Sequence, residues 1–276
     1  MDIDLPLVVN LVAAQFPQHS GLPVSRVEPG GNDNRTFRIG AELSARLPSA
    51  AGYVPAVVKE HRWLPELARK LAVAIPDPVG IGAPGSGYPW PWSLNRWLPG
   101  NDLLDVDKVD RTGLAASLGG FLAALHGIDG RNGPLAGQHS FYRGASLMHY
   151  DKEARSVLRT SDEAKVWVAA LASEWNGPPT WFHGDLAPGN ILIEGGRLSA
   201  VIDWGTSGVG DPACDLAIAW TFFDASERQV FASEAGLDAG TWSRARGWAL
   251  WKALITGSAE SERVVREVLN DPVLAG

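Results

Sequence analysis

Short strand-like segments dominate the first hundred residues of the chain. Their apolar residues are bounded by turns rich in glycine, proline and asparagine, which is typical of β-strands. We expect strands over residues 24–27, 36–39, 43–47 and 92–97. A helical repeat of apolar residues precedes the first strand and stops at Pro17, and a second helix is predicted over residues 56–71.

The pattern becomes helical in the second half of the chain. One apolar stripe repeats at three- and four-residue spacing and ends at His126-Gly127, as helices commonly end. The residues that form this stripe are Leu114, Leu118, Phe121, Leu122 and Leu125. Further helices are predicted over residues 151–175, 213–223, 241–256 and 260–269. The apolar positions of the first of these are Leu158, Trp167, Val168 and Leu171.

A glycine-rich stretch at residues 80–85, GIGAPG, has the spacing of a dinucleotide-binding loop. Such a loop opens directly into a helix, but this one continues into GSGYPWPW, whose glycines and prolines break helices. We therefore interpret residues 80–85 as a turn between two strands. The sequence contains no G-x-x-x-x-G-K-[ST] motif either, which argues against a Walker-type NTPase.

Residues 181–215 combine two short apolar strands with an unusual number of acids and amides. The strands are predicted over residues 191–193 and 198–202, with the turn signal Gly195-Gly196 between them. Folding this hairpin would return Asp203 to the end where Asn190 lies, with Asp185 within reach. Converging oxygen ligands suit a hard cation such as Mg²⁺, and a neighbouring carboxylate can accept a proton from a hydroxyl.

The motif HGDLAPGN followed by IDWG resembles the catalytic loop and metal-binding motif of the aminoglycoside and macrolide phosphotransferases, which are relatives of the protein kinases. The resemblance implies an α+β, bilobal, protein-kinase-like fold. It also implies a nucleotide-binding lobe over residues 1–98 and a catalytic and acceptor-binding lobe over residues 99–276.

The same resemblance assigns roles to individual residues of this segment. Asp185 would be the catalytic base, Asn190 and Asp203 would bind Mg²⁺, and His183 and Asp215 would brace the loop. For His183 an ordinary packed position is the alternative. Two neighbours stay outside the site, because Asp211 fits an N-cap before Pro212 and Trp204 fits a packing role.

The first lobe would bind ATP or GTP. The resemblance implies that the polar loop Gly31, Asn32, Asp33 and Asn34 contacts the phosphates and that Arg96, Trp97 and Leu98 lie near the purine. Protein kinases hold the phosphates with a strand lysine paired to a helix glutamate. Here Arg46 and Glu60 occupy those places, a departure that keeps the charge and allows bidentate phosphate binding. The alternative is an unremarkable surface pair.

Composition narrows the class of protein. The chain has 276 residues, a net charge of −7 and one cysteine, so we expect no nucleic-acid partner and no intrachain disulfide. A single cysteine fits the reducing cytoplasm. Asp2 and Asp4 stand where a secretion signal would be basic, which also fits a cytoplasmic protein. No apolar run reaches membrane-spanning length. Residues 101–276 hold 15 Lys/Arg and 23 Asp/Glu, which would suit a cationic acceptor or simply a solvated surface. The oligomeric state stays open, with a monomer as the working expectation.

The leading hypothesis is an Mg²⁺-dependent O-phosphotransferase that moves the γ-phosphoryl group of ATP or GTP to a hydroxyl of a small molecule, an aminoglycoside or macrolide antibiotic first. Three alternatives stand beside it. One is a kinase of the same fold that acts on a metabolite such as an amino alcohol or sugar. The others are a metallophosphoesterase, for which local histidine ligands are few, and a nucleotide-binding scaffold without catalysis.

Overall fold

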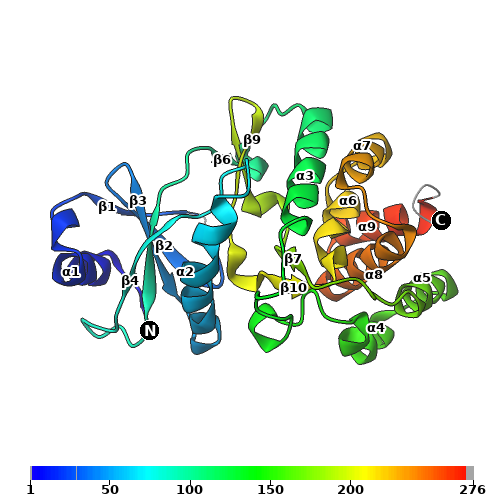
Figure 1. Ribbon diagram of the computed structural model, residues 1–276, viewed down its shortest axis with the longest axis horizontal. Helices are drawn as coiled ribbons and strands as arrows, with labels where there is room; N and C mark the ends of the chain where they lie inside the picture. The colour runs from blue at the N-terminus through cyan, green and yellow to red at the C-terminus, as the bar shows by residue number, and fades with distance from the viewer. Residues whose placement is uncertain (1, 29, 272–276) are drawn as a thin grey trace. The chain divides into compact units, whose positions relative to one another are not determined.

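A computed structural model describes residues 2–28 and 30–271, which fold into two compact units (Figure 1). The first unit comprises the described part of Met1–Pro99 together with Val201–Gly205. The second comprises Gly100–Ala200 and the described residues from Thr206 on. The segment that carries Asp203 thus packs with the first unit, although it follows the predicted catalytic hairpin in sequence.

The first unit is an antiparallel sheet with two helices. Its strands, in the order β1-β2-β3-β5-β4, are β1 (Val24–Arg26), β2 (Asn34–Ile39), β3 (Leu43–Pro48), β5 (Trp92–Arg96) and β4 (Pro78–Gly82). Helix α1 (Leu5–Gln15) contacts β1, and α2 (Val54–Ala68) contacts β4 and β5. The predicted strands and helices of this region are confirmed to within a few residues at their ends.

The core of the first unit explains why Arg46 is distinctive. Every residue of β3 is buried except Arg46, which is partly exposed. In the antiparallel register Arg46 lies opposite Thr36 of β2 and Ser93 of β5, while its neighbour Ala45 lies opposite Phe37 and Leu94 in the apolar layer. A charged residue at such a central position needs partners, since an unpaired buried charge is costly.

The prediction of a turn at residues 80–85 was wrong in its first half. Gly80 and Gly82 lie within β4, paired to β5. A Cβ at Gly82 would lie 2.0 Å from the Trp92 indole and one at Gly80 would lie 2.7 Å from the Phe16 ring, so these glycines make room for aromatic packing. The turn itself comes later, where Gly85 and Tyr88 exchange backbone hydrogen bonds.

The second unit is mainly helical. Its helices are α3 (Arg111–His126), α4 (Asp151–Val157), α5 (Ser161–Ala172), α6 (Ile218–Thr221), α7 (Ala225–Ala235), α8 (Ala239–Thr256) and α9 (Ala259–Asn270). Two small sheets accompany them. One pairs β7 (Thr180–Phe182) with β10 (Gly208–Gly210), and the other has the order β6 (Asn101–Asp102), β8 (Ile191–Glu194), β9 (Arg197–Val201).

Helix α8 is the central packing element of the second unit. It contacts α4, α5, α9 and the 3-10 helix Pro212–Ala217. Its buried residues include Trp242, Trp248 and Trp251, so the side of α8 that carries Lys252 is held in a fixed place. None of the helices in the described ranges is long and apolar enough to cross a membrane.

Two helical predictions for this unit need correction. Residues 151–175 form two helices rather than one, because Leu158 is extended and Thr160 with Glu163 forms a capping box that starts α5. Of the apolar positions named for this segment, Trp167 is buried and Val168 is 51% exposed. The segment 213–223 begins as a 3-10 helix and becomes α-helical only at Ile218.

Helix α7 was not predicted at all. Its apolar positions are sparse, since Glu227 and Arg228 are buried beside Phe231. The capping box formed by Asp224 and Glu227 is the local signal that could have revealed its start.

Candidate active site

The loop that carries Asp185 lies in the second unit, between β7 and the 3-10 helix Pro188–Asn190. Asp215, fully buried, accepts hydrogen bonds from the backbone N–H of His183 at 2.8 Å and of Gly184 at 2.6 Å. The Thr206 hydroxyl donates to the carbonyl of His183 at 3.0 Å. The backbone before Asp185 is therefore fixed from both sides.

Gly184 is required by the path of this loop. Its φ is +90°, and a Cβ would lie 2.8 Å from the carbonyl oxygen of Thr206. Only glycine adopts such a conformation without strain. The conformation of the loop therefore explains why the first glycine of HGDLAPGN, Gly184, stands at this position.

Gly184→Ala should lower the free energy of unfolding by about 1–3 kcal/mol, the usual cost of a residue held in an unfavourable backbone region. Gly195→Ala is the matched control, because Gly195 also has a positive φ of 57° but no atom within 4 Å of its Cβ position. Chemical denaturation of both variants measures the difference. An equal loss in the two variants would contradict the steric argument at Gly184.

Asn190 lies close to Asp185 and is oriented by it. The Asn190 side-chain amide donates to the backbone carbonyl of Asp185 at 2.8 Å and approaches its Oδ2 at 3.5 Å. With the nitrogen committed to this contact, the amide oxygen is the atom that faces away. An amide oxygen is a suitable ligand for a hard cation.

Two histidines lie behind the loop. His183 is fully buried, and its Nδ1 accepts from the backbone N–H of Asp185 at 3.2 Å, so Nδ1 carries no proton in this arrangement. The Nε2 of His126 lies 3.6 Å from Asp215 Oδ2. The sequence placed His126 at the end of a helix, and the structure adds that it lies beside the carboxylate that holds the loop.

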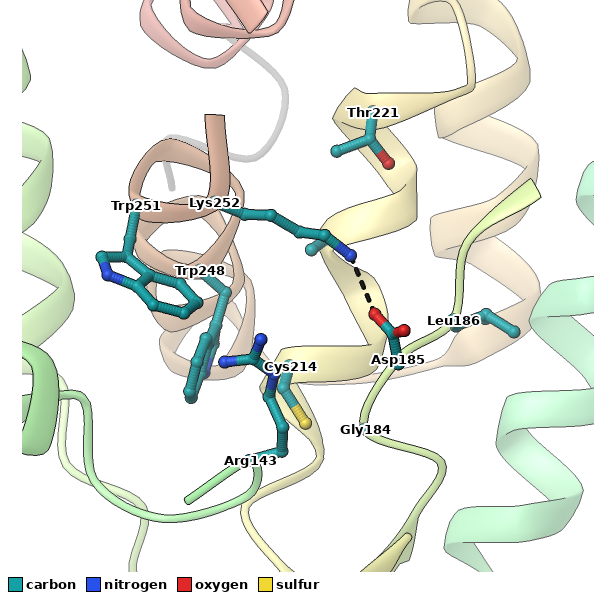
Figure 2. A pocket seen from close by; sticks show the side chains of 10 residues that line it. Arg143, Gly184, Asp185, Leu186, Cys214, Thr221, Trp248, Trp251 and Lys252 are labelled. Atoms are coloured by element: carbon teal, nitrogen blue, oxygen red, sulfur yellow. Dashed lines mark hydrogen bonds and ion pairs between the residues drawn. The ribbon is translucent and has the colours of Figure 1, made fainter. Parts of the chain in front are cut away.

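Lys252, on α8, was missed by the sequence analysis. Its ammonium group donates to Asp185 Oδ1 at 2.9 Å (Figure 2). Burial opposes the charged form of Asp185, but the attraction of Lys252 and its hydrogen bond outweigh this and lower the pKa of Asp185. Asp185 is therefore held as a carboxylate. Nothing local in the segment WKALIT marks this lysine as part of a site.

A pocket of the second unit opens beside Asp185 and Lys252 (Figure 2). Arg143 lies on its other side, with its guanidinium carbon 4.7 Å from the ring centre of Trp251 and 5.3 Å from that of Trp248. Cys214 also lines the pocket, and burial raises the pKa of its thiol well above the usual value. The thiol is thus neutral and contributes no charge.

The predicted phosphate-binding pair lies in the first unit, where Arg46 and Glu60 form a triad with Asp203. Arg46 Nη1 lies 3.2 Å from Glu60 Oε2, and Arg46 Nη2 lies 2.7 Å from Asp203 Oδ1. The side chains of Arg46 and Glu60 are only 15% and 5% exposed, so a simple surface pair is excluded. Asp203 has a φ of +64°, an uncommon conformation for a residue other than glycine.

The charges of this triad depend on one another. Burial raises the pKa of Glu60, and the neighbouring Arg46 only partly opposes that effect. Burial disfavours the charged form of Arg46, yet Glu60 and Asp203 together raise its pKa. Lys59 lies next to them and donates to the carbonyl of Gly205 at 2.7 Å, and burial lowers the pKa of Lys59 to about 8.

The remaining predicted nucleotide-binding residues lie at two places in the first unit. In the loop before β2, the Arg35 side chain donates to the carbonyl of Gly31 at 2.6 Å, and the Ser49 hydroxyl donates to that of Asn32 at 2.6 Å. The Ser49 backbone N–H donates to the carbonyl of Asp33 at 2.8 Å, and Asn34 begins β2. The loop is thereby tied to the end of β3.

The segment predicted to contact the purine follows β5. Arg96 pairs with Asp77 at 2.9 Å, and the guanidinium of Arg38 lies 4.6 Å from the ring centre of Trp97. The backbone N–H of Trp97 donates to the carbonyl of Glu42 at 2.7 Å, and Leu98 is partly buried. Trp97 is thus held by the protein itself, and the purine contacts of this segment stay a prediction.

The residue types predicted to bind the cation are chemically suited to Mg²⁺. Within residues 2–28 and 30–271 there is no cluster of three His, Cys, Asp or Glu side chains able to enclose a metal. Mg²⁺ in nucleotide-dependent enzymes needs fewer protein ligands, because phosphates and water complete its shell. The amide oxygen of Asn190 and a carboxylate oxygen of Asp203 are ligands of the required type.

A strand arginine pairs with a helix glutamate, and a loop carries an ionised carboxylate and an amide. These features are typical of a kinase-like phosphotransferase. Comparison with known proteins agrees. The chain belongs to the phosphotransferase enzyme family, APH, whose model matches residues 25–248.

Relatives and solved structures support the same fold. The protein YcbJ of Bacillus subtilis (strain 168) is 28% identical over 206 residues, which are 66% of this chain and 63% of that protein. The GDP complex of aminoglycoside 2'-phosphotransferase-IIIa superposes with a TM-score of 0.70 at 18% identity and covers 95% of this chain and 97% of its own. Macrolide 2'-phosphotransferase MphH from Brachybacterium faecium gives a TM-score of 0.67 at 25% identity and covers 98% of each chain.

These matches confirm the predicted α+β, bilobal, kinase-like fold. The match to YcbJ spans less than two thirds of the length of that curated relative, whereas the solved structures match over nearly their whole length.

Proposed function

We propose that the protein is an Mg²⁺-dependent phosphotransferase that moves the γ-phosphoryl group of ATP or GTP to a hydroxyl of a small molecule. The observation that carries this proposal is Asp185, a carboxylate kept ionised by Lys252 at the edge of a pocket. Family membership supports it, because phosphoryl transfer is the chemistry of the family. The functional division into a nucleotide-binding part, residues 1–98, and an acceptor-binding part, residues 99–276, belongs to the same proposal.

In the proposed reaction the acceptor hydroxyl oxygen forms a bond to the γ-phosphorus while the bond from that phosphorus to the β,γ-bridging oxygen breaks. The hydroxyl proton goes to the Asp185 carboxylate, and the nucleoside diphosphate leaves with the bridging oxygen. Asp185 orients the hydroxyl as well as accepting its proton. Asp215 and His183 fix the backbone of Asp185, so the carboxylate needs little rearrangement.

Arg46 would steady the phosphates in place of the usual lysine, held in position by Glu60. In this proposal Asn190 and Asp203 bind the metal ion, which supplies charge neutralisation for the phosphate oxygens when it is bound. Asp203 Oδ1 already accepts from Arg46, so the second carboxylate oxygen is the proposed ligand. The polar loop Gly31–Asn34 and the segment Arg96–Leu98 are the proposed contacts to phosphate and purine.

The nucleotide can be ATP or GTP. The structural relative in complex with GDP supports a guanine nucleotide for that protein, and by extension as a candidate here. Coupled assays of nucleoside diphosphate release, run with ATP and GTP in turn, decide between the two.

The acceptor class has two candidates. The structural relatives are named for aminoglycosides and macrolides, which supports an antibiotic acceptor. The two cations beside the pocket, Arg143 and Lys252, favour a hydroxylated metabolite as the second candidate. Nucleotide consumption by the purified protein against a panel of both kinds of compound tests the proposal, and no consumption with any acceptor would contradict it.

Removing Lys252 should shift the acid limb of the pH–rate profile. The pKa of Asp185 is lowered by Lys252, and the base must be ionised to act, so activity falls as the pH drops through that pKa. In Lys252→Met the pKa of Asp185 rises, and the acid limb of kcat/KM should move to higher pH. Lys165→Met is the control, since Lys165 is exposed and pairs with Asp162. An unchanged limb would mean that Lys252 does not set the charge of Asp185.

A further inference from the structure

The charge around the pocket beside Asp185 differs from what the acidic second half of the chain suggested. Among the residues that line it, Asp185 is the one carboxylate, and Arg143 and Lys252 are cations. The thiol of Cys214 is neutral, and the other lining groups with ring or aliphatic side chains carry no charge. With Asp185 and Lys252 paired, Arg143 is the remaining charged residue of the lining.

Arg143 forms no direct ion pair, although the charge of Asp185 lies near enough to attract it. Within the described part of the chain no carboxylate lies within ion-pair distance of its guanidinium, which donates to the Tyr150 hydroxyl at 3.3 Å. The indoles of Trp248 and Trp251 support it instead (Figure 2). An arginine that is packed but not neutralised by protein is a ready site for an anion, because its planar fork matches the oxygens of carboxylate and phosphate.

Three acidic residues of the second half of the chain are engaged by other side chains. Glu153 accepts from the Trp251 indole N–H at 2.8 Å, Asp151 pairs with Arg155, and Glu227 pairs with Arg111. None of them lines the pocket. These three carboxylates therefore do not contribute to the lining of the pocket, although the buried Asp215 lies behind the loop that carries Asp185.

The Trp251 ring is also less available to a cationic acceptor. Indole rings attract ammonium groups, but here Arg143 already lies over Trp251 at 4.7 Å. An aminated sugar placed in the pocket would meet the charges of Arg143 and Lys252 as well. Like charges brought together in this way oppose binding.

On the basis of the proposed phosphotransfer, we infer that the acceptor is a hydroxylated anion that binds this pocket with its carboxylate or phosphate group on Arg143 and its hydroxyl at Asp185. Lys252, already 2.9 Å from Asp185, contributes positive charge on the same side. The arrangement selects sugar acids, hydroxy acids or sugar phosphates over polycationic aminoglycosides.

Calorimetric binding to the full chain at low salt tests this with compounds that share one skeleton. The probes are glucuronate, glucose 6-phosphate, glucose and glucosamine, with kanamycin as the polycation. We expect at least one of the two anionic probes to bind about tenfold or more tightly than glucosamine, and kanamycin to bind more weakly still. The stronger of the two anions identifies the group as carboxylate or phosphate.

Substitutions at Arg143 link the preference to this residue. Arg143→Gln should remove most of the tenfold preference, and Arg143→Lys, which keeps the charge, should retain part of it. Arg131→Gln is the matched control, because Arg131 is exposed and pairs with Asp129, and it should leave the preference unchanged. Circular dichroism and thermal melting of each variant confirm that the comparison is between folded proteins.

The outcomes separate this inference from the proposed function. Equal or tighter binding of glucosamine or kanamycin, no binding of either anion, or a preference that survives in Arg143→Gln would overturn the inference. Efficient phosphorylation of kanamycin would overturn it while leaving the proposed phosphotransfer intact. Selective binding of an anion, with no consumption of ATP or GTP on any acceptor, would overturn the proposed function and leave the charge preference of the pocket standing.

Discussion

Replacing Asp185 by Asn should lower kcat by roughly 10²–10⁴-fold, the usual contribution of a positioned base. The amide keeps the shape of the side chain and an oxygen for the Lys252 ammonium, which lies 2.9 Å from Asp185 Oδ1. It cannot accept the proton of the acceptor hydroxyl. The KM for nucleotide should change little, because the substitution removes an interaction made mainly in the transition state. Steady-state kinetics with the strongest acceptor measures both parameters.

Asp162→Asn is the matched control for this experiment. Asp162 lies in the same unit, is exposed and pairs with Lys165. Its substitution should leave kcat within about twofold, as is usual for surface changes away from a site. If kcat is unchanged in Asp185→Asn, Asp185 is not the catalytic base, whatever the control variant shows.

The second large effect is expected at Arg46, in the first unit. Arg46→Met keeps the volume of the side chain but removes the cation between Glu60 and Asp203. Breaking a buried ion pair by removing one partner typically costs about 3–5 kcal/mol, because the remaining charge is uncompensated. The same change removes the proposed phosphate contact, so the KM for nucleotide should rise together with the loss of stability.

The stability loss in Arg46→Met should depend on pH in a defined direction. Burial already raises the pKa of Glu60, and loss of Arg46 raises it further. A folded-state pKa above the unfolded value means that the folded protein binds the proton more tightly, so stability is greater at low pH and falls as the pH rises through that folded pKa. The difference in free energy of unfolding between Arg46→Met and the native protein should therefore become smaller at pH values below the ordinary pKa of glutamate.

Urea denaturation at several pH values measures this dependence. Arg62→Met is the control, since Arg62 is 62% exposed and pairs with Glu66 on the same helix. The control should lose no more than about 1 kcal/mol at any pH. A pH-independent loss in Arg46→Met would show that Glu60 is not the charge left behind.

The sequence was most informative where chemistry is local. Asp185 and Asn190 lie five residues apart on one loop, and Asn190 contacts Asp185 through its side-chain amide. The glycine between His183 and Asp185 has a conformation that only glycine adopts easily. Spacing alone can therefore predict that two side chains of one loop lie together, because short segments have few ways to fold.

The strand pattern of the first unit could also be predicted, because short apolar runs bounded by turn residues are typical of β-strands. It failed at Gly80 and Gly82, where glycine makes room for Phe16 and Trp92 rather than forming a turn. Helix α7 was missed because its buried face includes Glu227 and Arg228, whose partners lie on other elements. In both cases packing partners distant in sequence decided the outcome.

The sequence by itself determined the class of fold, the loop that carries Asp185 and the place of Arg46 on a strand. Tertiary structure alone decided which cations pair with Asp185 and Asp203. Lys252 is 67 residues from Asp185, and Arg46 is 157 residues from Asp203. The chain has 24 lysines and arginines. The sequence does not distinguish a cation on a solvated helix surface from one, such as Lys252, that pairs with Asp185. Electrostatic interactions depend on distance and burial in space, and those are fixed only when the helices pack.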